Sequence, residues 1–168
     1  MKIAVVGCGA MGSVYAGLLA AVGHDIWAID AWNEHIESIK KNGLRLEGAS
    51  GDRTVKINAS VTASDAGKCD LIILATKTMH VEAAAQTCRD LIGPETLVLS
   101  IQNGLGGPDT AAKVLGKDRV LVGVVGGFGA SMKAPGHAHH NGWELVRLGE
   151  YSGPITPRLE GIAKVWES

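Results

Sequence analysis

Near its start the chain contains Lys2-Ile3-Ala4-Val5-Val6-Gly7-Cys8-Gly9-Ala10-Met11-Gly12, a β-branched run followed by a glycine-rich loop. The run predicts a buried parallel strand, and apolar residues at helical spacing predict a helix with one apolar face over residues 11–22. The loop glycines allow a sharp turn and the close approach of main-chain N–H groups to a pyrophosphate, while Gly12 lets the helix pack on the strand. The helix N-terminus adds unpaired donors and the positive end of its dipole. The pattern therefore predicts a dinucleotide site formed by Gly7, Cys8, Gly9, Ala10, Met11 and Gly12.

A second predicted strand covers residues 25–29 and is followed by a carboxylate at Asp30, eighteen residues beyond Gly12. In dinucleotide-binding folds an acid at this place accepts hydrogen bonds from the adenosine ribose. Asp30 could instead cap the helix that follows it, and both interpretations stay open. Cys8 also has two interpretations, because the helix dipole could lower the pKa of its thiol or the residue could simply be small and apolar.

Residues 3–23 carry no charge and have the length of a transmembrane span or a signal peptide. Five glycines interrupt this segment and fit a strand–loop–helix unit instead, so we expect no membrane insertion.

The 168-residue chain has a net charge of −1, from 16 Lys+Arg and 17 Asp+Glu, which disfavours nucleic acid as a partner. Its three cysteines at unrelated spacings indicate free thiols and predict a cytoplasmic location.

Predicted strands and helices alternate along the chain, which is typical of a doubly wound, mainly parallel α/β sheet of the Rossmann type, with ligand at the strands' carboxyl ends. We expect helices over 32–41, 79–92 and 109–115 and strands over 70–75, 96–101, 119–125, 137–141 and 143–148. Segments 44–47 and 54–57 predict a small hairpin at the sheet edge. We expect a dinucleotide-binding domain over residues 1–153, and over 154–168 the start of a helix that leads to a missing C-terminal domain.

Two polar side chains follow predicted strands and are candidates for the chemistry. Lys77 stands at the start of a helix, where its charge opposes the dipole, so an anion such as a phosphate or substrate carboxylate is expected nearby. A solvated surface lysine is the alternative. Asn103-Gly104 follows the next strand and is also a common turn dipeptide. His137, His139 and His140 have no acid or cysteine beside them, so we expect no metal site.

Three segments together resemble the N-terminal domain of ketopantoate reductases (2-dehydropantoate 2-reductases): the loop from Gly7 to Gly12, Ala75-Thr76-Lys77, and Ile101-Gln102-Asn103-Gly104-Leu105-Gly106. The resemblance implies an oxidoreductase that reduces a 2-keto acid with NAD(P)H, of the 2-dehydropantoate to pantoate type in pantothenate biosynthesis. It implies that Lys77 and Asn103, as catalytic and cofactor-contacting residues, line the cleft between cofactor and keto acid. It also implies that the main chain at Gly129 approaches the nicotinamide side.

The chain departs from this family pattern at two points. Ala31 stands where the family's usual basic residue for the 2′-phosphate of NADPH is expected, and Asp30 precedes it. Because a carboxylate there repels a phosphate, we expect NADH to be favoured over NADPH. The family's general-acid lysine and a substrate-binding acid lie in a C-terminal helical substrate domain that this chain lacks, so we expect the chain alone to be inactive.

A function of another class stays open. The glycine loop and the Asp-ended second strand are also similar to standalone NAD-sensing regulatory modules that gate ion transport. Lys77 and the Asn103 segment favour the enzyme, because a sensor needs no polar groups beside the nicotinamide. The identity of the 2-keto acid and the oligomeric state stay open.

Overall fold

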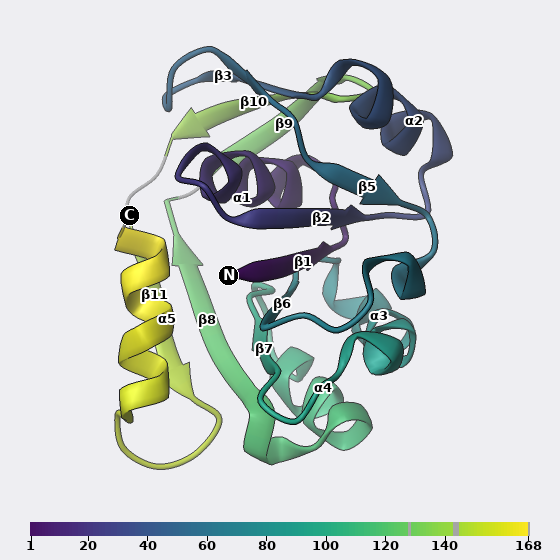
Figure 1. The fold of residues 1–168 in the computed structure, drawn as a ribbon. Coiled ribbons are helices and arrows are strands. Elements are labelled where there is room, and N and C mark those ends of the chain that lie inside the picture. Colours follow the sequence, from purple (N-terminus) through teal and green to yellow (C-terminus); the bar gives the residue numbers. More distant parts are fainter. Residues whose placement is uncertain (128, 143–144, 168) are drawn as a thin grey trace.

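The computed structural model describes residues 1–127, 129–142 and 145–167, and Figure 1 shows their arrangement. A seven-stranded sheet with the order β11-β8-β7-β6-β1-β2-β5 forms its centre. Its strands are β1 (Lys2–Val6), β2 (Asp25–Ile29), β5 (Asn58–Ser60), β6 (Leu71–Leu74), β7 (Leu97–Ser100), β8 (Val120–Gly126) and β11 (Leu145–Glu150). Neighbouring strands are parallel except for β11, which pairs antiparallel with β8. The predicted doubly wound, mainly parallel α/β fold is confirmed.

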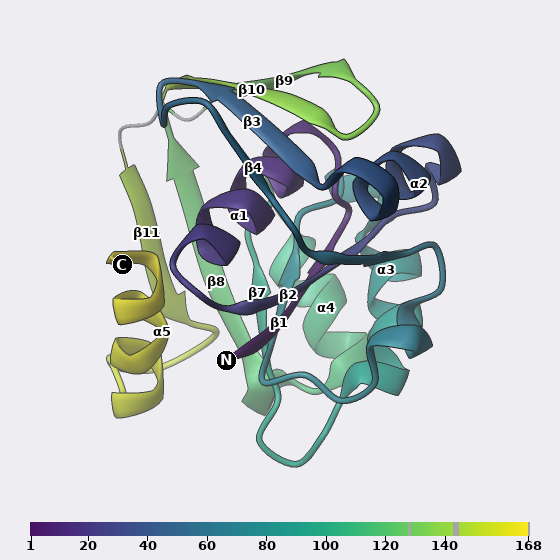
Figure 2. The ribbon, with the colours of Figure 1, turned by 45° about the horizontal axis from the view of Figure 1, so that its top comes forward.

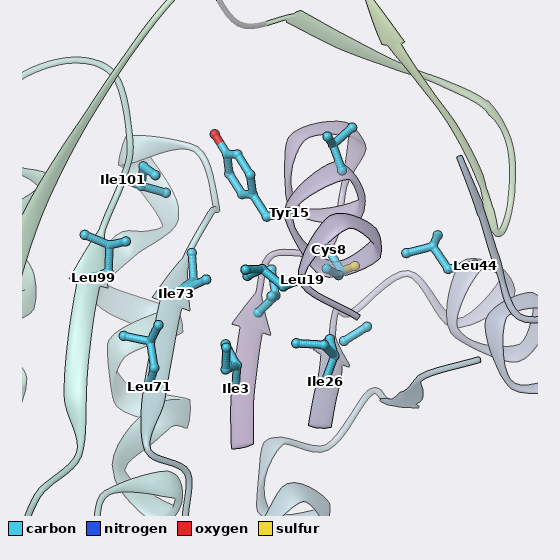
Figure 3. Close-up of a cluster of buried hydrophobic side chains, with 14 of the residues drawn as sticks. Ile3, Cys8, Tyr15, Leu19, Ile26, Leu44, Leu71, Ile73, Leu99 and Ile101 are labelled. Carbon is cyan, nitrogen blue, oxygen red and sulfur yellow. The ribbon is translucent and has the colours of Figure 1, made fainter. Parts of the chain in front are cut away.

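Helices cover both faces of this sheet. They are α1 (Ala10–Ala21), α2 (Asn33–Asn42), α3 (Val81–Thr87), α4 (Gly107–Leu115) and α5 (Pro157–Glu167), with short 3-10 helices at Ala63–Ala66, Thr78–His80, Cys88–Leu91 and Lys117–Arg119. Successive strand side chains point to opposite faces, so Ile3 packs in the core cluster beside α1 and Ala4 in the cluster beside α3. Figure 3 shows part of the first cluster. The predicted helix over 79–92 is three consecutive shorter segments.

A second, four-stranded sheet was not expected from the sequence. Its order is β4-β3-β10-β9, formed by β3 (Leu44–Gly48), β4 (Arg53–Val55), β9 (Gly129–Ala134) and β10 (His137–Gly142). The predicted hairpin exists as the antiparallel pair β3–β4, but its predicted place at the edge of the main sheet is wrong. β3 instead pairs in parallel with β10, and the second sheet lies over α1 (Figures 1 and 2). The edge strand of the main sheet is β5.

Helix α1 lies between the two sheets, and this corrects the expectation of a single apolar face. Seven of its twelve residues are buried, and they include the consecutive run from Gly12 to Gly17. A side chain at Gly17 would meet Leu46 of β3 at 2.4 Å, so the small residue permits the second sheet to pack closely. Burial on two sides explains why residues 3–23 carry no charge. Within the described residues no helix combines the length and apolar character needed to cross a membrane.

The C-terminal part of the described chain packs on the same body. Strand β11 is described from Leu145 to Glu150. Trp143, with which the predicted strand began, lies outside the described residues. Helix α5 confirms the predicted helix from Pro157, although Ser168 also lies outside. Leu159, Ile162 and Val165 of this helix are buried in the core cluster that contains α1. The domain boundary after Gly153 stays a prediction.

Candidate functional site

A cleft of about 840 Å³ opens at the carboxyl ends of β1, β2, β6 and β7. Every one of these strands delivers a loop residue to it, because parallel strands end at the same edge of the sheet. The predicted site residues that line it are Gly7, Gly9, Ala10, Met11, Asp30, Lys77 and Asn103. The structure therefore brings together most of the residues that the sequence analysis selected.

The three glycines of the loop occupy their positions for different structural reasons. Gly7 has a φ of +89°, and a Cβ there would lie 2.6 Å from the Thr76 nitrogen. A Cβ at Gly12 would lie 2.2 Å from the Gly7 carbonyl oxygen, so only glycine fits there. Gly9 has an ordinary φ of −72°, and no atom would lie within 4 Å of its Cβ. Gly9 therefore borders open space in the cleft, which a pyrophosphate can fill.

The N-terminus of α1 faces this space. Gly9 is its N-cap residue, and no side chain in the described part of the chain caps it. The first-turn N–H groups and the positive end of the helix dipole are therefore available to an anion. The chemistry and the free space of the loop fit the pyrophosphate of a dinucleotide.

Cys8 does not face the cleft. Its side chain is fully buried in the core beside Ser13, with the sulfur 3.7 Å from the Ser13 hydroxyl oxygen. Burial raises the pKa of the thiol to about 12, against a smaller lowering by the hydrogen bond with Ser13. Of the two interpretations, the small apolar residue is therefore the one the structure supports, and only the main chain of Cys8 can serve a cofactor.

Asp30 lies in the cleft directly after β2 and is partly engaged in a local turn. Its Oδ1 accepts a hydrogen bond from the Trp32 main-chain N–H at 2.9 Å, just before α2. No partner for Oδ2 occurs among the described residues. Asp30 does not cap α2, whose N-cap residue is Trp32 and which no side chain in the described part of the chain caps. One oxygen of Asp30 instead fixes the turn before the helix, and the other can accept from a ribose.

Lys77 and Asn103 lie on loops that are joined to each other. The Thr78 hydroxyl donates a hydrogen bond of 2.9 Å to the Asn103 carbonyl oxygen, and both predicted residues are exposed on the cleft wall. Lys77 forms no ion pair within the ranges that the structure describes. A cation and an amide therefore line the cleft from two adjoining loops, where they can bind the oxygens of an acidic ligand.

Sequence reasoning missed the part that Gln102 plays. Its Nε2 donates to the Leu74 carbonyl oxygen at 2.7 Å, and its Oε1 accepts from the Ser100 hydroxyl at 2.7 Å. The side chain thus ties the end of β7 to the end of β6 and fixes the loop that presents Asn103. The available signal was its position inside the segment Ile101-Gln102-Asn103, but its partner Leu74 lies 28 residues away in the sequence.

Two other sequence expectations concern residues outside the cleft wall. Gly129 begins β9 and packs against Asn141, while its neighbour Ala130 lines the cleft. His137 and His139 each contact a different oxygen of Glu47, at 3.0 and 3.3 Å. Over residues 1–127, 129–142 and 145–167, no group of three or more metal-binding side chains is suitably placed for a metal ion.

A second groove of about 920 Å³ lies between α1, β11 and α5. Most of its lining side chains are apolar, and none of the loop residues from Gly7 to Gly12 borders it. Size alone would favour this groove over the cleft. The cleft is nevertheless the better candidate, because it holds the glycine loop, the free helix N-terminus and the polar residues.

Comparison with known proteins gives a consistent result. The family model described as ketopantoate reductase PanE/ApbA matches residues 3–153. A 2-dehydropantoate 2-reductase of Pyrococcus horikoshii is 39% identical over 152 residues, which cover 90% of this chain and 48% of that protein. The structure of a 2-dehydropantoate 2-reductase from Geobacter metallireducens superposes with a TM-score of 0.92 at 30% identity, covering 99% of this chain and 55% of that one.

A third similar protein was solved with ligands. It is a D-mandelate dehydrogenase in a ternary structure with NADH and anilino(oxo)acetate, with a TM-score of 0.86 and 29% identity over 99% of this chain and 53% of that one. The chain spans about half the length of the curated relatives it matches.

Proposed function

Because the chain belongs to the ketopantoate reductase family, we propose that it provides the dinucleotide-binding part of an oxidoreductase that reduces a 2-keto acid with NAD(P)H. The observation that carries the proposal is the cleft, in which the glycine loop and the Lys77–Asn103 pair face one space. The family assignment favours this enzyme over an NAD-sensing module.

The residues have distinct roles in this proposal. The N–H groups at the start of α1 bind the pyrophosphate, with Gly9 leaving the room for it. Asp30 binds the adenosine ribose. The nicotinamide, when bound, supplies the hydride that reduces the keto carbon. Lys77 and Asn103 hold the carboxylate and carbonyl oxygens of the keto acid so that its keto carbon faces the reduced ring.

The substrate class has support from chemistry and from the relatives. A 2-keto acid carries adjacent carboxylate and carbonyl oxygens, which match an ammonium and an amide side by side. The D-mandelate dehydrogenase was solved with an oxoacetate, and the relatives from Pyrococcus and Lactococcus are named for 2-dehydropantoate. We therefore propose reduction of the 2-dehydropantoate to pantoate type, in pantothenate biosynthesis.

The first test separates cofactor binding from turnover. The purified chain should bind NADH or NADPH saturably in titration calorimetry, because the pyrophosphate site is complete. It should reduce 2-dehydropantoate poorly, because the family's general-acid lysine has no match among the motif residues of this chain. A general acid typically raises the reaction rate about 100- to 10,000-fold. Failure to bind either dinucleotide would refute the proposed function, whereas turnover at an ordinary enzyme rate would refute only the expected inactivity.

A second test addresses Lys77 and Asn103. The variants are made in the polypeptide that reduces the keto acid, which is either this chain or a longer one that contains it. Lys77→Ala and Asn103→Ala should each lower kcat/KM at least about tenfold, because each removes an oriented, charge-assisted hydrogen bond to the substrate. Thermal unfolding should barely change, because both side chains are exposed. Lys113→Ala, which removes an exposed lysine from α4 outside the cleft, is the matched control. Unchanged kinetics in both cleft variants would leave Lys77 as a solvated surface residue and Asn103 as a turn residue.

A further inference from the structure

A chain of buried hydrogen bonds runs from the glycine loop to the turn between β9 and β10. The Ser13 hydroxyl donates to the Cys8 carbonyl oxygen at 3.1 Å, and its oxygen lies 3.3 Å from Nε2 of His35. Nδ1 of His35 accepts from the Gly136 main-chain N–H at 2.9 Å. Ser13 and His35 have no exposed surface. Neither residue belongs to the cleft wall, so their polarity needs an explanation other than ligand contact.

The hydrogen bonds define the tautomer of His35. The main-chain N–H of Gly136 can only donate, so Nδ1 must be the unprotonated ring nitrogen. Nε2 then carries the proton and donates toward Ser13, whose own hydrogen goes to the Cys8 carbonyl. All three links are satisfied together only when the imidazole is neutral.

This series of hydrogen bonds fixes the orientation of the peptide between Cys8 and Gly9 in the glycine loop. The carbonyl of Cys8 and the N–H of Gly9 belong to the same trans peptide, in which the two groups point in opposite directions. Holding the Cys8 carbonyl toward the buried Ser13 therefore points the Gly9 N–H away from Ser13, and Gly9 itself lines the cleft. If the carbonyl were free to rotate, this donor would be lost to the anion.

We propose that His35, acting through Ser13, is a positioning residue that holds the Cys8–Gly9 peptide with its N–H facing the pyrophosphate and so couples dinucleotide binding to the β9–β10 turn. The inference rests on the proposed function for its ligand. The coupling spans the molecule, because α1 lies between the main sheet and the sheet that contains β9 and β10 (Figure 1).

Protonation of His35 would disrupt this series of hydrogen bonds. A second ring proton would sit on Nδ1 and face the Gly136 N–H, placing two donors against each other. The titratable groups near the ring are the Asp30 carboxylate after β2 and the neutral Cys8 thiol, and the Trp32 ring stacks on it at 5.1 Å. Burial lowers the pKa of His35, and the charge of Asp30 and a hydrogen bond to the Cys8 main chain oppose this only in part.

The pH dependence has a definite sign. Because the folded state holds a proton on this ring less readily than the unfolded state, the stabilising contribution is complete above the ordinary histidine pKa of about 6.5 and is lost as the pH falls below it. Dinucleotide affinity should fall only at a lower pH than this, because the neutral form that binds is depleted as the pH approaches the lowered pKa of His35 in the folded chain.

NADH binding by four variants tests the proposal. Ser13→Ala and His35→Leu should weaken NADH about fivefold or more at pH 7.5, the usual effect of one lost hydrogen bond. His35→Gln should stay within about threefold of wild type, since glutamine has a donor and an acceptor but no titration. Ser38→Ala is the matched control, because Ser38 donates to the Pro135 carbonyl of the same turn at 2.9 Å without contacting the loop, and it should not change affinity. Over the pH range in which the nitrogen chemical shifts show that His35 of the folded chain takes up its second proton, wild type should lose more affinity than His35→Gln.

Two outcomes would overturn the inference. If the Ser13→Ala variant folds and binds NADH as tightly as wild type, the inference is wrong, even if His35→Leu fails to fold. Nitrogen chemical shifts of His35 in the ligand-free chain give a reading independent of cofactor, and an Nδ1–H tautomer or an ordinary titration would also exclude the mechanism. If wild type binds no dinucleotide while His35 shows the neutral Nε2–H form, the proposed function fails and the role in dinucleotide binding fails with it, leaving a structural link only.

Discussion

Gly9→Val should abolish dinucleotide binding and leave the chain folded. The backbone of Gly9 has a φ of −72° that valine accepts, and its Cβ would meet no atom within 4 Å. The added side chain would occupy the space in front of the α1 N-terminus and separate a pyrophosphate from its donors. Losing two charge-assisted hydrogen bonds of about 1.5–3 kcal/mol each predicts an affinity loss of at least about 100-fold. Titration calorimetry together with thermal unfolding measures both parts of the prediction.

Neighbouring glycines provide the contrast. Gly12→Ala should destabilise the fold itself by about 1–3 kcal/mol, because its Cβ would lie 2.2 Å from the Gly7 carbonyl oxygen. Gly161→Ala on α5 has free space around it and should change neither stability nor binding appreciably. If Gly9→Val binds NADH and NADPH with wild-type affinity, the pyrophosphate does not lie on this loop and the proposed site is wrong.

The first strand–loop–helix–strand unit could be predicted from sequence because its determinants are local. Glycines at 7 and 12 are required by contacts with Thr76 and with the loop itself, and the apolar strands are buried on both faces. The position of Asp30, Lys77 and Asn103 also followed from a general rule, since each succeeds a parallel strand. Such residues meet at one edge whatever the details of the loops.

The second sheet could not be predicted in the same way. It depends on a parallel pairing of β3 with β10, strands that lie about ninety residues apart in the sequence. The predicted strand over 137–141 exists as β10, but β9 consists of Gly, Ala, Ser, Met and Lys and lacks the Val/Ile enrichment that marks a strand. Because this sheet was missed, α1 was expected to have one apolar face, and the burial of Ser13 and His35 could not be foreseen.

Cofactor preference is the second large effect that the cleft predicts, and it depends on Asp30. The carboxylate can accept from the 2′-hydroxyl of NADH, but it opposes the 2′-phosphate of NADPH, and Ala31 offers no compensating charge. A repulsion of about 1–2 kcal/mol at such a solvent-accessible separation corresponds to roughly a 5- to 30-fold preference for NADH. Parallel titrations with the two cofactors measure this ratio, and tighter binding of NADPH would show the preference to be wrong.

The bond from the Trp32 N–H to Asp30 makes it necessary to separate charge from turn formation. Asp30→Asn keeps an acceptor for that N–H and removes the charge, so it should relax the preference at little cost in stability. Asp30→Ala combined with Ala31→Arg should go further and favour NADPH, because the guanidinium binds the 2′-phosphate directly. Asp25→Ala, at the opposite end of β2, controls for the loss of a carboxylate from the same strand. A ratio that stays constant in both cleft variants would assign Asp30 to the turn alone, since a group that selects the cofactor through its charge cannot lose that charge without effect.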